Sequence, residues 1–150
     1  MATESRVLII EDIDVLRVML FTILRHQPLA VDTATNCVEA LEKASTCDYA
    51  LILLDADLPD GDAAEFLRRF DADHADAPTF IVAVRGPESE PLVHPRIGAV
   101  LNKPLEIDTL AELVRECAAV VPPPDEPVQC PPAESEIRER MDRSGSFYSN

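Results

Sequence analysis

Short runs of apolar residues alternate along the chain with longer segments in which apolar residues recur every third or fourth position. The short runs predict five strands buried on both faces, at 6–10, 29–33, 50–54, 79–84 and 99–102. The segments between them predict helices at 15–24, 36–44, 62–70 and 106–121. Asp12 or Asp14 should cap the first helix and Asn36 the second, with Val15 and Val38 on their inward faces. This alternation predicts an α/β fold with a doubly wound, five-stranded parallel sheet.

The stretch from Arg85 to Gly98 lacks a helical pattern. Pro87, Pro91 and Pro95 lie in it at intervals of four residues, and each proline inside a helix costs about 3 kcal/mol. We therefore expect the fourth helix of the alternation to be degenerate, either short or broken.

Composition changes again near residue 121. Six prolines occupy the eleven positions from 122 to 132, so this segment should run extended rather than pack. Beyond it the charges are mixed and few residues are apolar, which predicts at most a frayed helix followed by a disordered end. The expected division is a domain at 1–121, a proline-rich linker at 122–132 and a tail, mostly disordered, at 133–150.

The chain carries 28 acidic and 13 basic residues, a formal net charge of −15. Such a charge repels nucleic acids and anionic membranes, so neither is an expected partner. The N-terminus lacks a signal-peptide pattern and no apolar run reaches about 18 residues, which favours a cytoplasmic protein.

The four cysteines show no metal-binding or redox spacing. Cys37, Cys47 and Cys117 lie in apolar or small-residue surroundings and are expected to be buried thiols, whereas Cys130 lies in the linker. No zinc or redox site is expected.

Charged residues follow three of the predicted strands. Glu11 and Asp12 end the first, Asp55 the third and Lys103 the fifth, and right-handed crossovers should bring these ends side by side. Three carboxylates this close repel one another unless a cation intervenes, and Mg²⁺ suits a small oxygen-rich cluster. An aspartate beside such an ion and a lysine is placed to attack phosphorus. The site therefore favours phosphoryl transfer onto a carboxylate.

Three motifs at these strand ends carry a resemblance to a known family: 7–12, ending in Glu11-Asp12, then 53–59 around Asp55, and 102–104, Asn-Lys-Pro. From about Arg6 to Val121 the chain resembles the receiver domain of bacterial two-component response regulators, which has a flavodoxin-like fold. The resemblance implies that Glu11, Asp12, Asp55 and the backbone carbonyl of Asp57 bind Mg²⁺. It also implies that Asp55 accepts a phosphoryl group from a phosphohistidine, that Lys103 contacts the phosphoryl oxygens, and that the Lys103–Pro104 peptide is cis.

Two positions depart from the family pattern. Ala83 stands where the family has a serine or threonine hydroxyl that follows the phosphoryl group, and alanine cannot make that bond. Val100 stands at the aromatic switch position. Together with the prolines, these changes predict that phosphate is still accepted but that the conformational switch is weak.

Three functions remain open on the sequence. The first is a single-domain response regulator that is not an enzyme beyond handling its own phosphoryl group. Its partners would be a histidine kinase or histidine phosphotransfer protein and a downstream target protein. The second is a receiver-like binding module that works without phosphorylation. The third is an aspartyl phosphatase, because Asp55-Ala56-Asp57 resembles the D-x-D of haloacid-dehalogenase-type phosphatases. Asp57 itself could be only a turn residue or could tune hydrolysis.

Overall fold

The computed structural model describes residues 5–120 and 130–145. Five strands form one sheet in the order β2-β1-β3-β4-β5, with every neighbouring pair parallel. The strands are β1 (Ser5–Ile10), β2 (Leu29–Ala34), β3 (Leu51–Asp55), β4 (Phe80–Arg85) and β5 (Ile97–Asn102). The predicted doubly wound α/β sheet is confirmed.

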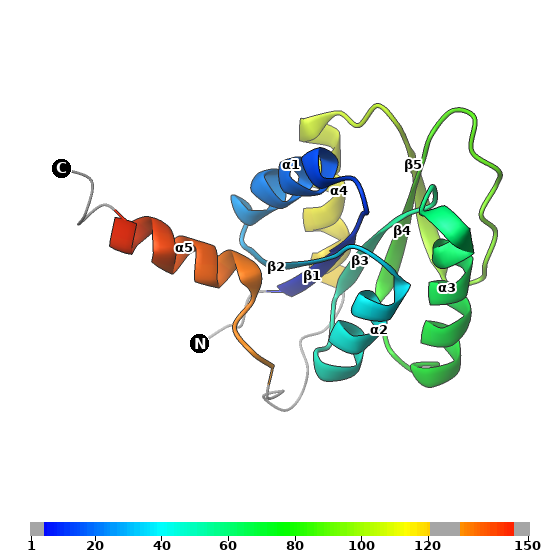
Figure 1. Ribbon diagram of the computed structural model, residues 1–150, viewed down its shortest axis with the longest axis horizontal. Coiled ribbons are helices and arrows are strands. Elements are labelled where there is room, and N and C mark those ends of the chain that lie inside the picture. Colours follow the sequence, from blue (N-terminus) through cyan, green and yellow to red (C-terminus); the bar gives the residue numbers. More distant parts are fainter. Residues whose placement is uncertain (1–4, 121–129, 146–150) are drawn as a thin grey trace.

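Helices cover both faces of the sheet (Figure 1). On one face lie α1 (Asp14–Arg25) and α4 (Ile107–Val120), and on the other α2 (Cys37–Thr46) and α3 (Asp62–Asp73), which follows a short 3₁₀ turn, η1 (Pro59–Gly61). Alternate side chains of each strand point to opposite faces, so the sheet separates two apolar clusters. Leu8 and Ile52 pack with α2 and α3, whereas Val7 and Leu53 pack with α1 and α4.

The predicted N-cap residue is right for α2 and wrong for α1. The Asn36 side chain accepts a hydrogen bond from the Glu39 amide at 2.9 Å. Ile13 occupies the N-cap of α1 and makes no side-chain bond. Val15 and Val38 are 80% and 61% exposed, which contradicts their predicted inward positions. Each lies one residue away from the stripe that the sheet actually covers, for example Leu20 and Leu24 in α1.

Between β4 and β5, residues 86–96 form no helix, which confirms the degenerate fourth helix. Arg96 holds the end of this loop by donating hydrogen bonds to the backbone carbonyls of His74, Ala75 and Ala77. At Gly98 an added Cβ would lie 2.5 Å from the Phe80 ring, so only glycine allows that ring to pack across β5.

The C-terminal part differs from the expected disordered tail. Residues 134–145 form α5 (Glu134–Gly145), which lies beside β2. Few residues of α5 are apolar, so its contacts with the sheet hold its first residues in place. Most of the predicted linker and the last five residues lie outside the described ranges, and the division at 1–121, 122–132 and 133–150 stays a prediction in its boundaries.

The cysteine prediction needs one correction. Cys37 is a buried free thiol, as expected, but Cys47 forms a disulfide with Cys130. The two residues are 83 positions apart, and no sequence spacing indicated their pairing. Over residues 5–120 and 130–145, no helix has the length and apolar character needed to cross a membrane.

Candidate functional site

Three acidic side chains meet at the carboxyl ends of β1 and β3. Because β1 pairs with β3 through Ile10 and Leu54, Glu11 follows its strand directly beside Asp55. One carboxylate oxygen from each of Glu11, Asp12 and Asp55 lies within 4.8 Å of the others. Glu11 and Asp55 are 1% and 4% exposed, whereas Asp12 is exposed.

The buried carboxylates are only partly satisfied. Asp55 Oδ1 accepts hydrogen bonds from the Asp57 amide and from Lys103 Nζ, each at 3.0 Å. Among the described residues, Asp55 Oδ2 and both carboxylate oxygens of Glu11 have no hydrogen-bond partner. Leaving a buried charged oxygen unpaired is costly. A divalent cation with oxygen ligands would satisfy these atoms, so the residues present fit a hard metal ion.

The pKa of Glu11 also indicates that the cluster fits a metal ion. Burial and the negative charge of the adjacent Asp55 raise the pKa of Glu11 to about 9. In the protein alone this carboxyl therefore holds a proton at neutral pH. A metal ion bound at the cluster would favour the ionised form instead.

Lys103 reaches the cluster from β5, across β4. The sequence placed the ends of the first, third and fifth strands side by side, but β4 lies between β3 and β5. The long lysine side chain spans this gap and lies 3.0 Å from Asp55 Oδ1 and 3.2 Å from Asp57 Oδ2. Although partial burial lowers it, the hydrogen bond and charge of Asp55 raise the pKa of Lys103 overall. The predicted cis peptide between Lys103 and Pro104 is confirmed.

Asp57 joins the site to the loop that replaces the fourth helix. Its carboxylate accepts hydrogen bonds from the Gly86 amide at 2.9 Å, from Ser89 Oγ and from Lys103. Partial burial raises its pKa, but the bonds from Ser89, Gly86 and Lys103 outweigh this and lower the pKa of Asp57. Sequence reasoning missed Gly86 and Ser89. The sequence signal that could have found them is the turn-forming run Gly-Pro-Glu-Ser directly after β4. The carboxyl end of β4 adjoins the site.

Neither altered switch position supplies a hydroxyl. Ala83 pairs with Leu54 in the sheet and is 1% exposed, and the next residue, Val84, pairs with Asp55. Val100 is 48% exposed on β5. Ser89, from the loop, brings a hydroxyl to the site by way of Asp57.

Comparison with known proteins agrees with this geometry. The family model for the response regulator receiver domain matches residues 7–115. The chain belongs to this family. This receiver domain is 34% identical over 113 residues to the KDP operon transcriptional regulatory protein KdpE of Escherichia coli, covering 74% of this chain and 50% of that protein. It is 30% identical over 112 residues to the transcriptional regulatory protein PmrA of Pectobacterium parmentieri, covering 73% and 50%.

The solved structures support the fold. A response regulator receiver domain protein, CheY-like, from Methanospirillum hungatei matches with a TM-score of 0.66 and 21% identity, over 78% of this chain and 95% of that one. Response regulator TrrA from Thermotoga maritima, in complex with Mg²⁺-BeF, matches with a TM-score of 0.61 and 24% identity, over 75% and 98%. The receiver domain spans about half the length of the curated relatives that it matches.

Proposed function

We propose that this receiver domain accepts a phosphoryl group on Asp55 from a phosphohistidine in a two-component phosphorelay. Glu11, Asp12, Asp55 and the backbone carbonyl of Asp57 would hold Mg²⁺, and Lys103 would contact the phosphoryl oxygens. The observation that supports this most is the buried, partnerless Oδ2 of Asp55 beside the equally partnerless Glu11 carboxylate. Such atoms are expected where a cation and a phosphoryl group bind.

The chemistry requires one bond exchange. A carboxylate oxygen of Asp55 attacks phosphorus, the bond between phosphorus and the donor imidazole nitrogen breaks, and histidine leaves. Oδ2 is the oxygen available for this attack, because Oδ1 is held by Lys103 and the Asp57 amide. Bound Mg²⁺ supplies positive charge that offsets the negative charge of the phosphoryl oxygens. The Lys103 ammonium supplies a second, fixed positive charge.

The surface next to the acids suits a protein donor. Ile13, Val15, Val18 and Met19 follow the acidic pair and are 53%, 80%, 59% and 39% exposed. Exposed apolar side chains so close together favour a docking partner, here a histidine kinase or a histidine phosphotransfer protein. We further propose a cytoplasmic protein whose output, as a single domain, passes through contacts with a target protein.

Asp57 does not suit the rival phosphatase mechanism. In a D-x-D phosphatase the second aspartate serves as the acid and base. Here the bonds from Ser89, Gly86 and Lys103 lower its pKa, so it holds no proton to donate at neutral pH. The same bonds occupy both of its oxygens.

Incubation with acetyl phosphate and Mg²⁺ tests the proposal. Intact-mass spectra should show one phosphoryl adduct on the full chain, or, where hydrolysis is faster than sampling, steady consumption of acetyl phosphate. Both signals should disappear in Asp55→Asn. Asp60→Asn is the matched control, because Asp60 lies five residues later in the exposed turn, with a φ of 61° that asparagine tolerates. Absence of both signals in the wild type would overturn the proposal in favour of a phosphorylation-independent binding module.

The conformational response should be small, since Ala83 and Val100 lack the groups that transmit it. Amide NMR spectra with and without beryllofluoride and Mg²⁺ should show shifts concentrated near Asp55. Large shifts across residues 85–102 would instead show a working switch.

A further inference from the structure

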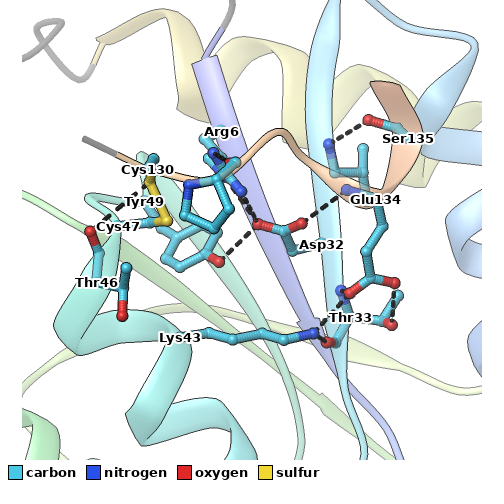
Figure 2. Close-up of polar contacts among 12 residues, drawn as sticks. Arg6, Asp32, Thr33, Lys43, Thr46, Cys47, Tyr49, Cys130, Glu134 and Ser135 are labelled. Atoms are coloured by element: carbon cyan, nitrogen blue, oxygen red, sulfur yellow. Dashed lines mark hydrogen bonds and ion pairs between the residues drawn. A yellow bond between two sulfur atoms is a disulfide. The ribbon is translucent and has the colours of Figure 1, made fainter. Parts of the chain in front are cut away.

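The start of residues 130–145, here called the C-terminal segment, lies against the outer edge of β2 (Figure 2). Because β2 is the first strand in the sheet order, its outward amides have no neighbouring strand to bond among the residues that the structure describes. The Val31 amide donates to Ser135 Oγ at 2.7 Å, and the Thr33 amide donates to Glu134 Oε1 at 2.9 Å. Side chains of the segment thus satisfy two successive outward amides of the edge.

Charged groups reinforce this contact from both sides. Thr33 Oγ1 donates to Glu134 Oε2 at 2.8 Å, and Lys43 Nζ lies 2.6 Å from Glu134 Oε1 (Figure 2). Asp32 Oδ1 accepts a hydrogen bond from the Glu134 amide at 2.9 Å, at the start of α5. Arg6 donates to the Pro131 carbonyl at 2.8 Å. The segment is therefore held through its backbone as well as its side chains.

The contact is part of the protein interior. Ala133 is 0% exposed, and Ser135 and Asp32 are 7% and 4% exposed. The partners of Glu134 and Ser135 lie 91 to 104 positions earlier in the chain. The contact uses a carboxylate and a hydroxyl at adjacent positions, Glu134 and Ser135.

A disulfide bond also joins the C-terminal segment to the rest of the domain. Cys47, which follows α2, forms its disulfide with Cys130, the first residue of the segment. Cys47 also lines a cavity of about 310 Å³ together with Lys43, Thr46 and Pro131. A small dithiol entering this cavity would approach the disulfide from the side of Cys47.

We propose that Cys47 and Cys130 form a thiol–disulfide latch that sets how firmly the C-terminal segment covers the β2 edge. With the disulfide formed, the segment stays seated. With the two thiols free, the segment depends on its noncovalent contacts alone, and the Val31 and Thr33 amides become open to exchange or to another extended chain. The proposal does not depend on phosphorylation of Asp55.

The opening reaction is thiol–disulfide exchange with a dithiol reductant. One reductant thiolate attacks a sulfur of the pair, the bond between Cys47 and Cys130 breaks, and a mixed disulfide forms. The second reductant thiol then displaces the cysteine from this intermediate. Two electrons and two protons pass to the protein, leaving two cysteine thiols, and the reductant becomes a disulfide.

Hydrogen exchange of the full chain, oxidised or treated with dithiothreitol, tests the latch. Reduction should speed exchange at the Val31 and Thr33 amides by about tenfold or more, because it removes the local tether. Amides of β3, in the centre of the sheet, should be unchanged. Cys130→Ser should exchange at the reduced rate under both conditions, whereas Cys37→Ser, which removes the buried free thiol, should respond like the wild type.

Two further variants separate the latch from the polar contacts. Glu134→Gln and Ser135→Ala should speed exchange at Thr33 and Val31 respectively, even with the disulfide intact. Equal protection of both amides in the oxidised, reduced and Cys130→Ser proteins would overturn the latch. So would alkylation and intact mass showing that Cys47 and Cys130 remain thiols under mild oxidation.

Discussion

Asp32 and Asp55 are equally buried, at 4% exposed each, but their surroundings differ. Both oxygens of Asp32 are used: Arg6 and Tyr49 bond one and the Glu134 amide bonds the other. Asp55 has one oxygen that bonds to nothing in the part of the chain that the structure describes. A saturated buried carboxylate holds a structure together, whereas an unsaturated one destabilises the protein until a ligand arrives. The β2 edge is thus a structural contact, and the carboxyl ends of β1 and β3 are the proposed binding site.

The largest expected change in the free energy of unfolding is for Asp32, whose two carboxylate oxygens are both hydrogen-bonded. Asp32→Ala would leave the half-buried Arg6 and the buried Tyr49 hydroxyl without this shared partner, and breaking a buried charged pair costs about 3–5 kcal/mol. Urea unfolding of the oxidised full chain should show this loss of unfolding free energy. Asp48→Ala, which removes an exposed carboxylate, should leave it unchanged. A loss as small as that of the control would mean that Asp32 is not structural.

Metal binding at the cluster of Glu11, Asp12 and Asp55 should stabilise the folded protein. At free Mg²⁺ one hundred times its dissociation constant, binding to the folded state raises the free energy of unfolding by about 2.7 kcal/mol. Urea unfolding with Mg²⁺ or with a chelator measures the difference. Asp32→Ala should keep this increment, since it does not touch the acidic cluster. An equal unfolding free energy in Mg²⁺ and chelator would contradict a metal site.

Glu11→Gln should have a smaller effect on the free energy of unfolding, present without metal and lost with Mg²⁺. Without metal the wild type must take up a proton at Glu11 on folding, because burial raises the pKa of this group. Glutamine needs no proton, so the variant should have an unfolding free energy higher by about 1–2 kcal/mol at neutral pH. With Mg²⁺ that advantage should disappear, because the variant loses a ligand. A variant that is less stable than the wild type without metal would show that Glu11 already has a stabilising partner.

The smallest change in the free energy of unfolding is expected for Ser89, which links the candidate site to the loop between β4 and β5. Ser89→Ala removes a hydrogen bond to the exposed Asp57 and should cost about 0.5–1 kcal/mol. The Gly86 amide, which also bonds Ser89 Oγ at 2.8 Å, should exchange faster, while Val31 stays unaffected. Ser45→Ala, at an exposed hydroxyl of α2, is the matched control. Unchanged exchange at Gly86 would show that Ser89 does not hold the loop.

Much of the site could be predicted from sequence because its acids lie directly at strand ends. An apolar run followed by Glu11 or Asp55 reports both the strand and the place where its side chain emerges. Lys103 was found in the same way, although the sequence put its strand beside the third and the sheet inserts β4. Ser89 was missed because a loop residue carries no periodic signal, and its partner Asp57 lies 32 positions away.

Local features of the chain were enough to predict the parallel sheet, the broken fourth helix and the acids with their lysine, since each follows from hydrophobic pattern, proline content or position at a strand end. The packing of Glu134 and Ser135 against β2, the pairing of Cys130 with Cys47 and the identity of the unpaired carboxylate oxygens are seen only in the folded chain. These contacts join residues about 80 to 100 positions apart. No local pattern encodes them, because such pairs form only after the sheet has set the distance between their elements.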